Sequence, residues 1–297
     1  MIMKDQLKRD GFVVVRGLLE PDEARHYRNK METLAHAGPT GAKKAVDKRG
    51  LMTSWTLPDG VVQTPDFWPI IYNEKLVEIV RQIVSPDIRF LQHNDLHVGF
   101  SAISWHRDSV NREFGLGPDW QEQAEPYRLV RVGIYLQSYA ESGFRLGFIK
   151  GSHYPLPYIT FRRRLMEARL KWIGALSYAF VKLQTWASNA DWIATEPGDA
   201  IIFDPRTLHS GSYITGPKRS IFVAYGQENQ HFYNHHNYYR HFRSELGYRD
   251  FDPALILALK ERGLYQDKTP HYTDIPAAYT PIPVVRNFIN RKVKAKG

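Results

Sequence analysis

Cysteine is absent from the 297 residues of this chain. Without cysteine the protein has no disulfide scaffold, no thiol nucleophile, no cysteine-ligated zinc and no iron–sulfur cluster. Any metal must therefore be held by His, Asp or Glu side chains or by water.

Long hydrophobic runs are absent as well. The longest apolar stretch, Trp172–Val181, has ten residues and includes Ser177 and Tyr178. A transmembrane helix needs about 20 apolar residues, so we expect no membrane-spanning segment. The N-terminal region lacks an apolar core followed by a small-residue cleavage site, and we expect no signal peptide. A soluble, cytoplasmic protein is the resulting expectation.

Most of the chain lacks an excess of either acidic or basic residues, although the formal net charge is +9. Residues 155–184 and the tail from Val284 each carry an excess of five positive charges, and the remainder is close to neutral. A general nucleic-acid-binding protein is basic over a whole face, so we expect no nucleic-acid partner. The two basic segments could contact a phosphate, an anionic lipid or a second subunit, or could be solvated.

Hydrophobic periodicity predicts helices first and strands afterwards. Helices are predicted over residues 21–37 and 73–84, with a long loop rich in Gly, Pro and Lys over residues 38–66. Several strands in series, with helices gathered before them, indicate an α+β protein with an antiparallel sandwich or barrel. The predicted strands are residues 12–15, 88–98, 129–136, 144–149, 200–203 and 220–225.

Two segments decorate this predicted core. Residues 155–195 form an insert with a basic amphipathic helix over residues 161–187. Its helix could be a lid, could form a homodimer, or could contact a membrane surface that holds a lipid-like substrate. We expect one domain over residues 1–226, and a helical C-terminal extension over residues 227–297 that packs on it.

Three side chains predict a metal site. His106 and Asp108 stand two residues apart, and alternate residues of a strand point to the same face. One imidazole nitrogen and one carboxylate oxygen can therefore reach the same ion. His209, which follows the predicted strand at residues 200–203, supplies a third ligand. Two histidines and a carboxylate form a facial triad, which leaves positions open on Fe(II) for a co-substrate and O₂.

An arginine follows the triad. Arg219 lies ten residues beyond His209, on the next predicted strand. A guanidinium at that place can hold a carboxylate through two parallel hydrogen bonds.

With these motifs in this order, the sequence resembles the phytanoyl-CoA dioxygenase family of Fe(II)/2-oxoglutarate oxygenases. The resemblance runs from about residue 8 to residue 226. It rests on five segments, which are Asp10–Leu19, Ser104–Asp108, Gly151–His153, Gly198–His209 and Arg219.

The resemblance implies a double-stranded β-helix (jelly-roll, cupin-like) core with helices packed on its outer face. It also implies that His106, Asp108 and His209 bind iron and form the catalytic centre. Arg219 is implied to hold the distal carboxylate of 2-oxoglutarate.

Other positions follow from the same resemblance. In the strand before the metal motif, Asn94 best matches a second 2-oxoglutarate contact, and Gln92 shares its face. His153 matches a turn residue that is usually structural. The chain departs from the family pattern at Lys150, where many members have proline.

The leading hypothesis is a dioxygenase that uses Fe(II), 2-oxoglutarate and O₂ to hydroxylate an unactivated C–H bond of a small molecule from natural-product or secondary metabolism. Asp108 argues against halogenation, because halogenases of the family have a small residue in its place. The same cofactors could instead support desaturation, cyclisation, C–N cleavage or epimerisation. A non-catalytic jelly-roll binding module and a zinc-holding protein are alternatives of another class. A second metal site at His231 and His235 is a further alternative to a packed aromatic helix there.

Overall fold

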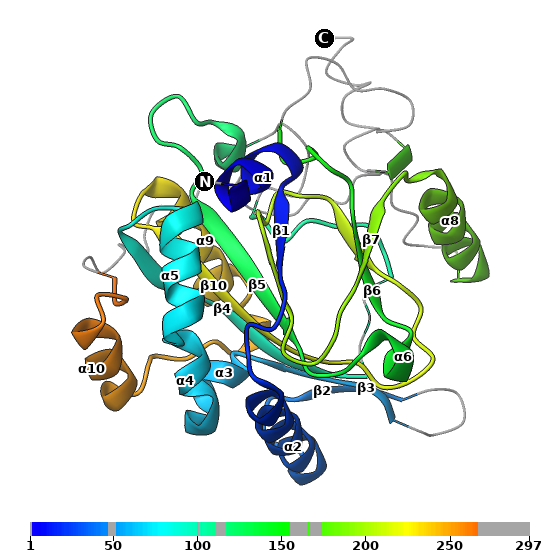
Figure 1. The fold of residues 1–297 in the computed structure, drawn as a ribbon, viewed down its shortest axis with the longest axis horizontal. Coiled ribbons are helices and arrows are strands. Elements are labelled where there is room, and N and C mark those ends of the chain that lie inside the picture. Colours follow the sequence, from blue (N-terminus) through cyan, green and yellow to red (C-terminus); the bar gives the residue numbers. More distant parts are fainter. Residues whose placement is uncertain are drawn as a thin grey trace.

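The computed structural model describes residues 2–46, 52–99, 101, 103–110, 117–154, 165–166 and 174–266. Two antiparallel sheets form the core of this described part (Figure 1). The large sheet has the strand order β1-β8-β5-β10-β4-β3-β2, and the small sheet has the order β7-β6-β9. The strands are β1 (Phe12–Val15), β2 (Lys43–Val46), β3 (Met52–Pro58), β4 (Ile88–Val98), β5 (Leu129–Tyr135), β6 (Arg145–Phe148), β7 (Asp191–Ala194), β8 (Ala200–Phe203), β9 (His209–Gly211) and β10 (Arg219–Gln227).

Side-chain alternation along β10 shows how the core is divided. Phe222 points between the two sheets, where an aromatic cluster draws residues from β1, β5, β6, β8 and β10. Ile221, Val223 and Tyr225 point to the opposite face, into a second and larger apolar cluster. Both faces of this strand are therefore buried, as in a jelly roll that carries helices outside. The predicted α+β double-stranded β-helix is confirmed.

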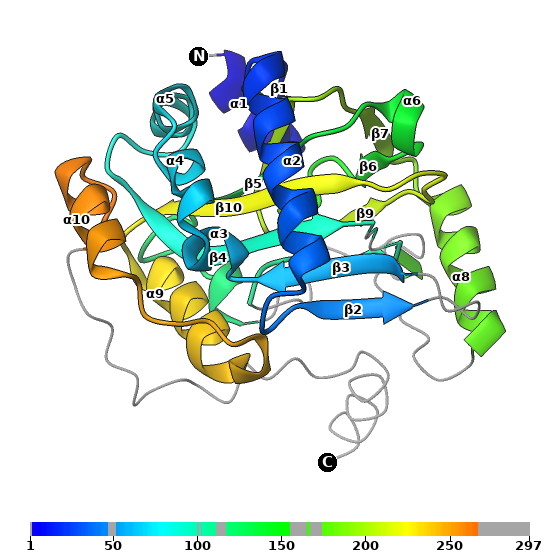
Figure 2. The same cartoon turned by 90° about the horizontal axis from the view of Figure 1, so that it is seen from below.

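Helices cover the outer face of the large sheet (Figure 2). Helix α2 (Pro21–Ala37) contributes Tyr27 and Met31 to the large cluster, and α5 (Glu74–Ile83) contributes Leu76 and Val80. Both helices were predicted from their apolar spacing and start signals. The remaining helices are α1 (Ile2–Asp10), α3 (Gly60–Gln63), α4 (Trp68–Ile71), α6 (Tyr139–Ser142), α8 (Gly174–Ala187), α9 (Gln230–Asn237) and α10 (Pro253–Glu261).

The prediction of a long loop over residues 38–66 is wrong. This segment contains β2, β3 and α3, and β3 extends the large sheet by pairing with β4. Trp55 and Leu57 of β3 are fully buried in the large apolar cluster. The pairing depends on the edge of a distant strand, which local Gly and Pro signals do not reveal.

The insert and the extension flank the core at opposite sides (Figure 1). Helix α8 forms the C-terminal half of the predicted insert helix, while residues 161–164 and 167–173 lie outside the described residues. The extension continues from β10 through α9, a short helix over Tyr238–Phe242 and α10. Its tail beyond residue 266 lies outside the described residues.

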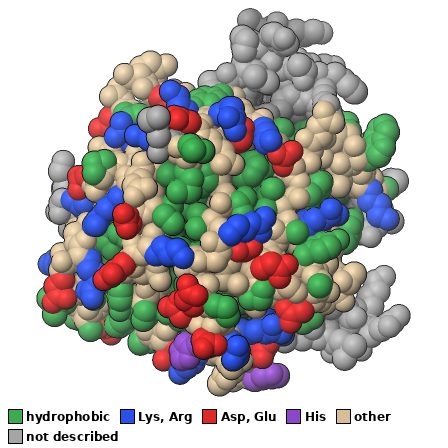
Figure 3. All heavy atoms as spheres, viewed as in Figure 1, with side chains coloured by type: hydrophobic (Ala, Val, Ile, Leu, Met, Phe, Trp, Pro, Cys, Tyr) green, Lys and Arg blue, Asp and Glu red, His purple; other side chains and the backbone are tan. Residues whose placement is uncertain are grey.

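Charges of both signs are interspersed on the face seen in Figure 3. Most of the two basic segments named above lies outside the described residues. Among the helices that the structure describes, none is long and apolar enough to cross a bilayer.

Candidate metal centre

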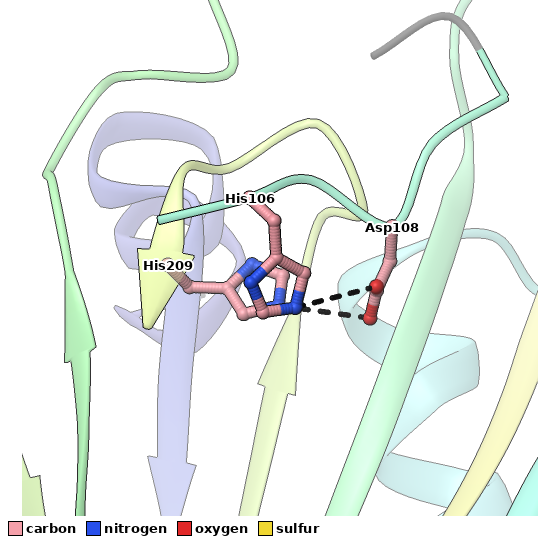
Figure 4. Close-up of side chains that lie close together, drawn as sticks. All are labelled: His106, Asp108 and His209. Atoms are coloured by element: carbon pink, nitrogen blue, oxygen red, sulfur yellow. Dashed lines mark ion pairs between the residues drawn. The ribbon is translucent and has the colours of Figure 1, made fainter. Parts of the chain in front are cut away.

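The three predicted ligands meet at one point, where β9 closes against the segment before residue 110 (Figure 4). His106 and His209 form an antiparallel bridge, with N–H···O distances of 2.9 Å and 3.0 Å. The bridge sets their imidazoles side by side, with ring centroids 4.3 Å apart. The Asp108 carboxylate lies 3.8 Å from His106 Nε2 and 3.6 Å from His209 Nε2. Such spacings fit three ligand atoms that surround one ion at about 2.0–2.2 Å each.

The backbone sets the orientation of both imidazoles. Nδ1 of His106 lies 2.7 Å from the carbonyl oxygen of Ser104, and Nδ1 of His209 lies 2.8 Å from that of Thr207. A carbonyl only accepts, so each Nδ1–H donates and each Nε2 keeps its lone pair. Donation of the other ring nitrogen to a carbonyl is the usual support of a metal-binding histidine. The donor set therefore fits a divalent metal.

Asp108 is held as a carboxylate. Burial raises the pKa of this carboxyl, but the positive charge of the nearby Arg131 guanidinium outweighs burial and holds the pKa of Asp108 well below its usual range. Arg131, on β5, donates from Nη1 to Asp108 Oδ2, and the backbone N–H of Asp108 donates to the carbonyl of Pro205 at 2.9 Å. The side chain is thus charged and fixed before any ion binds.

Arg219 is not brought to this centre. Its side chain leaves the outer face of the large sheet and forms an ion pair with Glu32 of α2 at 2.6 Å. The expected contact with a co-substrate beside the triad therefore disagrees with the geometry. The physical reason is strand alternation, because a shift of one residue exchanges the two faces of a strand.

Asn94 and Gln92 are brought together, but not with the triad. Both donate to the buried carboxylate of Asp59, Asn94 at 2.9 Å and Gln92 at 3.1 Å. Asn94 Oδ1 also accepts from the backbone N–H groups of Val61 and Val62 in α3. These contacts use the amides to join β4 to α3, away from the interior of the jelly roll.

Lys218, which belongs to none of the sequence motifs, faces the interior instead. It is 3% exposed, and its Nζ lies 4.6 Å from the ring centre of Phe144 and 5.4 Å from that of Phe222. No acidic side chain of the described residues pairs with it. Burial and the nearby Arg131 lower the pKa of Lys218 to about 7.

Two hydroxyl groups lie on the same inward face. Ser220 and Tyr135 are opposite each other in the pairing of β10 with β5. Within the described part of the chain, the oxygen of each hydroxyl is buried and has no hydrogen-bond partner. A buried cation without an acid and two unpaired hydroxyls fit an anionic ligand with several acceptor oxygens. In the sequence Lys218-Arg219-Ser220, strand alternation places the first and third residues on one face. This spacing is the sequence feature that could have indicated Lys218 and Ser220 as an inward-facing pair.

The remaining predicted positions have structural contacts. His153 is buried, and its ring nitrogen lies 2.9 Å from the carbonyl of Lys8, in line with a turn-supporting role. His231 Nε2 lies 3.0 Å from the carbonyl of Glu125, and His235 Nε2 lies 2.9 Å from Nδ1 of His93. Among the described residues, only the triad has the geometry of a group of three metal ligands.

A jelly roll that gathers two histidines and one aspartate at a strand end defines an iron- and 2-oxoglutarate-dependent oxygenase. The family model for phytanoyl-CoA dioxygenase (PhyH) matches residues 7–221, and the chain belongs to this family. The predicted family and enzyme class are confirmed. No curated protein sequence matches the chain.

Solved structures with the same fold are distant in sequence. The nonheme alpha ketoglutarate dependent epimerase SnoN from nogalamycin biosynthesis has 15% identity and a TM-score of 0.54, over 76% of this chain and 82% of SnoN. HygX from Streptomyces hygroscopicus, with nickel and 2-oxoglutarate bound, has 16% identity and a TM-score of 0.52, over 76% and 86%. EctD from S. alaskensis, with 2-oxoglutarate and 5-hydroxyectoine, has 16% identity and a TM-score of 0.51, over 75% and 74%.

Proposed function

We propose that this protein is a dioxygenase that binds Fe(II) at His106, Asp108 and His209 and oxidises a small organic molecule with 2-oxoglutarate and O₂. The observation that carries the proposal is the pair of imidazoles whose Nε2 atoms face one carboxylate inside a jelly roll. When bound, Fe(II) with 2-oxoglutarate and O₂ supplies the oxidising power to break an unactivated C–H bond, and 2-oxoglutarate leaves as succinate and CO₂. The favoured outcome is hydroxylation of a natural-product or secondary metabolite.

The co-substrate anchor in this proposal is Lys218 rather than Arg219. Lys218 supplies the positive charge for the distal carboxylate, and the hydroxyls of Tyr135 and Ser220 supply hydrogen bonds. Support comes from the buried ammonium group, which no described acid neutralises, and from the two unpaired hydroxyl oxygens. Arg219 already has a partner in Glu32.

The protein also has to exclude water from the reacting centre. Phe203 and Phe148 lie with ring centres 4.9 Å and 5.9 Å from that of His209, and both belong to the aromatic cluster between the sheets. An apolar wall of this kind strengthens the attraction between Lys218 and a bound carboxylate, because the local dielectric constant is low.

A second candidate keeps the cofactors and changes the product. SnoN is an epimerase, and SnoK from the same biosynthesis is a carbocyclase with 13% identity and a TM-score of 0.54. The triad is compatible with these outcomes because the fate of the substrate radical depends on how the substrate is held. Product analysis distinguishes them: hydroxylation adds one oxygen atom from O₂, whereas desaturation, cyclisation and epimerisation add none.

An anaerobic titration with Fe(II) and 2-oxoglutarate tests the proposal. We expect a weak visible charge-transfer band in the wild-type protein and none in His209→Ala. Lys30→Ala, which removes a solvent-exposed ion pair with Asp66 at 3.1 Å, serves as a folded control and should keep the band. No band in the wild-type protein under reducing conditions would refute the dioxygenase and favour a non-catalytic jelly-roll module.

A further inference from the structure

A second buried carboxylate stands behind the metal centre. Asp95 of β4 accepts from Nη2 of Arg131, while Nη1 of the same guanidinium donates to Oδ2 of Asp108. All three side chains are buried, with exposed fractions of 6–8%. One arginine therefore bridges the metal-binding aspartate and an acid that has no role in the proposed reaction.

The bridge is constrained because both terminal nitrogens of Arg131 donate to a carboxylate. A guanidinium is planar, so fixing both terminal nitrogens fixes the whole group. The Phe222 ring packs under it, with its centre 4.7 Å from the Arg131 Cζ. Asp95 also lies 3.5 Å from the hydroxyl of Tyr248, which donates to it.

The same geometry leaves the two oxygens of Asp108 unequal. Oδ2 accepts from Arg131, whereas Oδ1 faces His106 Nε2 at 3.8 Å and is the oxygen that Arg131 leaves to the metal side. If Asp95 did not hold Nη2, the guanidinium could turn and donate from both arms to both oxygens of Asp108, as Arg–carboxylate pairs commonly do. Arg131 would then compete with a metal ion for Oδ1, which it does not contact now.

We propose that Asp95 is a positioning residue for the metal centre: it holds one arm of Arg131 and so keeps Oδ1 of Asp108 available to the ion. This inference rests on the metal binding proposed above. Two tyrosines that contact these aspartates, Tyr248 and Tyr239, belong to the C-terminal extension and lie outside residues 7–221, which the family model matches. The Tyr239 hydroxyl donates to the backbone carbonyl of Asp108 at 3.3 Å.

Metal affinity without co-substrate tests the role of Asp95. Co(II) is titrated anaerobically into the full chain, and its visible ligand-field spectrum is recorded. We expect Asp95→Asn to weaken Co(II) binding about 10–100-fold, the usual cost of losing the support of a metal ligand, and to shift the spectrum. Asp59→Asn is the matched control: Asp59 is an equally buried acid that accepts from amides and not from Arg131, and its variant should bind Co(II) within about twofold of wild type.

A double-mutant cycle separates positioning from general damage to the fold. If Asp95 acts through Arg131, Asp95→Asn should have little further effect on Co(II) affinity in an Arg131→Gln background. Arg131→Lys gives a second route should Asp95→Asn not fold, because a single ammonium cannot span both carboxylates, and it too should weaken Co(II) binding.

The possible failures are distinguishable. Wild-type affinity in folded Asp95→Asn, or full additivity with Arg131→Gln, would overturn the role of Asp95 and leave the dioxygenase intact. If the His209→Ala variant binds Co(II) as tightly as the wild-type protein, both proposals are overturned.

Discussion

Lys218 and Arg219 are consecutive, yet their side chains leave opposite faces of the large sheet. Lys218 lies among the aromatic rings between the sheets, and Arg219 pairs with Glu32 of α2. The two positions therefore belong to different environments, one inside the jelly roll and one under the helical layer.

This relationship predicts unequal effects on co-substrate binding. Lys218→Met should weaken 2-oxoglutarate binding about 30-fold or more, because a buried carboxylate without a charged partner costs about 2–3 kcal/mol. Arg219→Met should leave the 2-oxoglutarate dissociation constant within about threefold and should lower stability, because it breaks a half-buried ion pair with Glu32. Calorimetry of the metal-loaded protein measures both. The reverse order would restore Arg219 as the anchor.

The pKa of Lys218, about 7, predicts a pH dependence of co-substrate binding. Above pH 7 the free protein holds a neutral lysine, so an arriving carboxylate must bring a proton with it. Affinity should then fall about tenfold for each pH unit above 7, because each pKa unit corresponds to about 1.4 kcal/mol. Lys218→Arg stays charged and should lose this dependence. Equal slopes in the two proteins between pH 7 and 9 would contradict the assignment.

Metal binding should stabilise the folded chain, because the ligands come together only after folding. Co(II) at about 100 times its dissociation constant adds about 2.7 kcal/mol to the free energy of unfolding. For a chain of 297 residues, with an entropy of unfolding of about 0.6 kcal/mol/K, that gain raises the melting temperature by about 4 °C. A chelator should reverse the rise, and Asp108→Ala should show none. A rise that persists in Asp108→Ala would mean that the metal binds elsewhere.

Asp59 predicts a pH dependence of stability. Burial raises the pKa of this carboxyl to about 6, despite hydrogen bonds from Arg249, Asn94, Gln92 and Gln63. The folded state therefore holds a proton that the unfolded state releases near pH 4, so this group lowers stability as pH rises from about 4 to 6. The loss is about 3 kcal/mol by linkage.

Urea unfolding at pH 4.5 and pH 6.5 measures this effect. Asp59→Asn should remove this loss. Its free energy of unfolding should therefore fall less, or rise more, between pH 4.5 and pH 6.5 than that of the wild-type protein. An unchanged difference would show that Asp59 titrates normally.

Local patterns in the sequence predict much of this fold. The apolar spacing and Pro21 predict α2 with its bounds, alternation predicts β4, and a short apolar run predicts β8. The triad is also visible in the sequence, because His106 and Asp108 stand two residues apart and His209 follows a strongly apolar strand. The structure has an isolated bridge at His106 where a strand was expected. These features depend on neighbours within a few residues.

Other features depend on distant partners and stay hidden in the sequence. Strand β3 requires the edge of β4, so the segment that contains it resembles a loop. A shift of one residue along the strand decides whether Lys218 or Arg219 faces inward. The number of residues from His209 does not determine that shift. Asp95 and Arg131 lie on separate strands, and only the folded sheet brings their charges together.

The backbone bridge between His106 and His209 determines when, during synthesis of the chain, the metal site can form. These residues are 103 positions apart, and the bridge forms only when β9 closes against β6 and the segment before residue 110. A chain still emerging from the ribosome offers no complete set of ligands until residues beyond Gly211 have been synthesised. Iron loading therefore cannot precede the synthesis of His209 and the closure of β9 against β6.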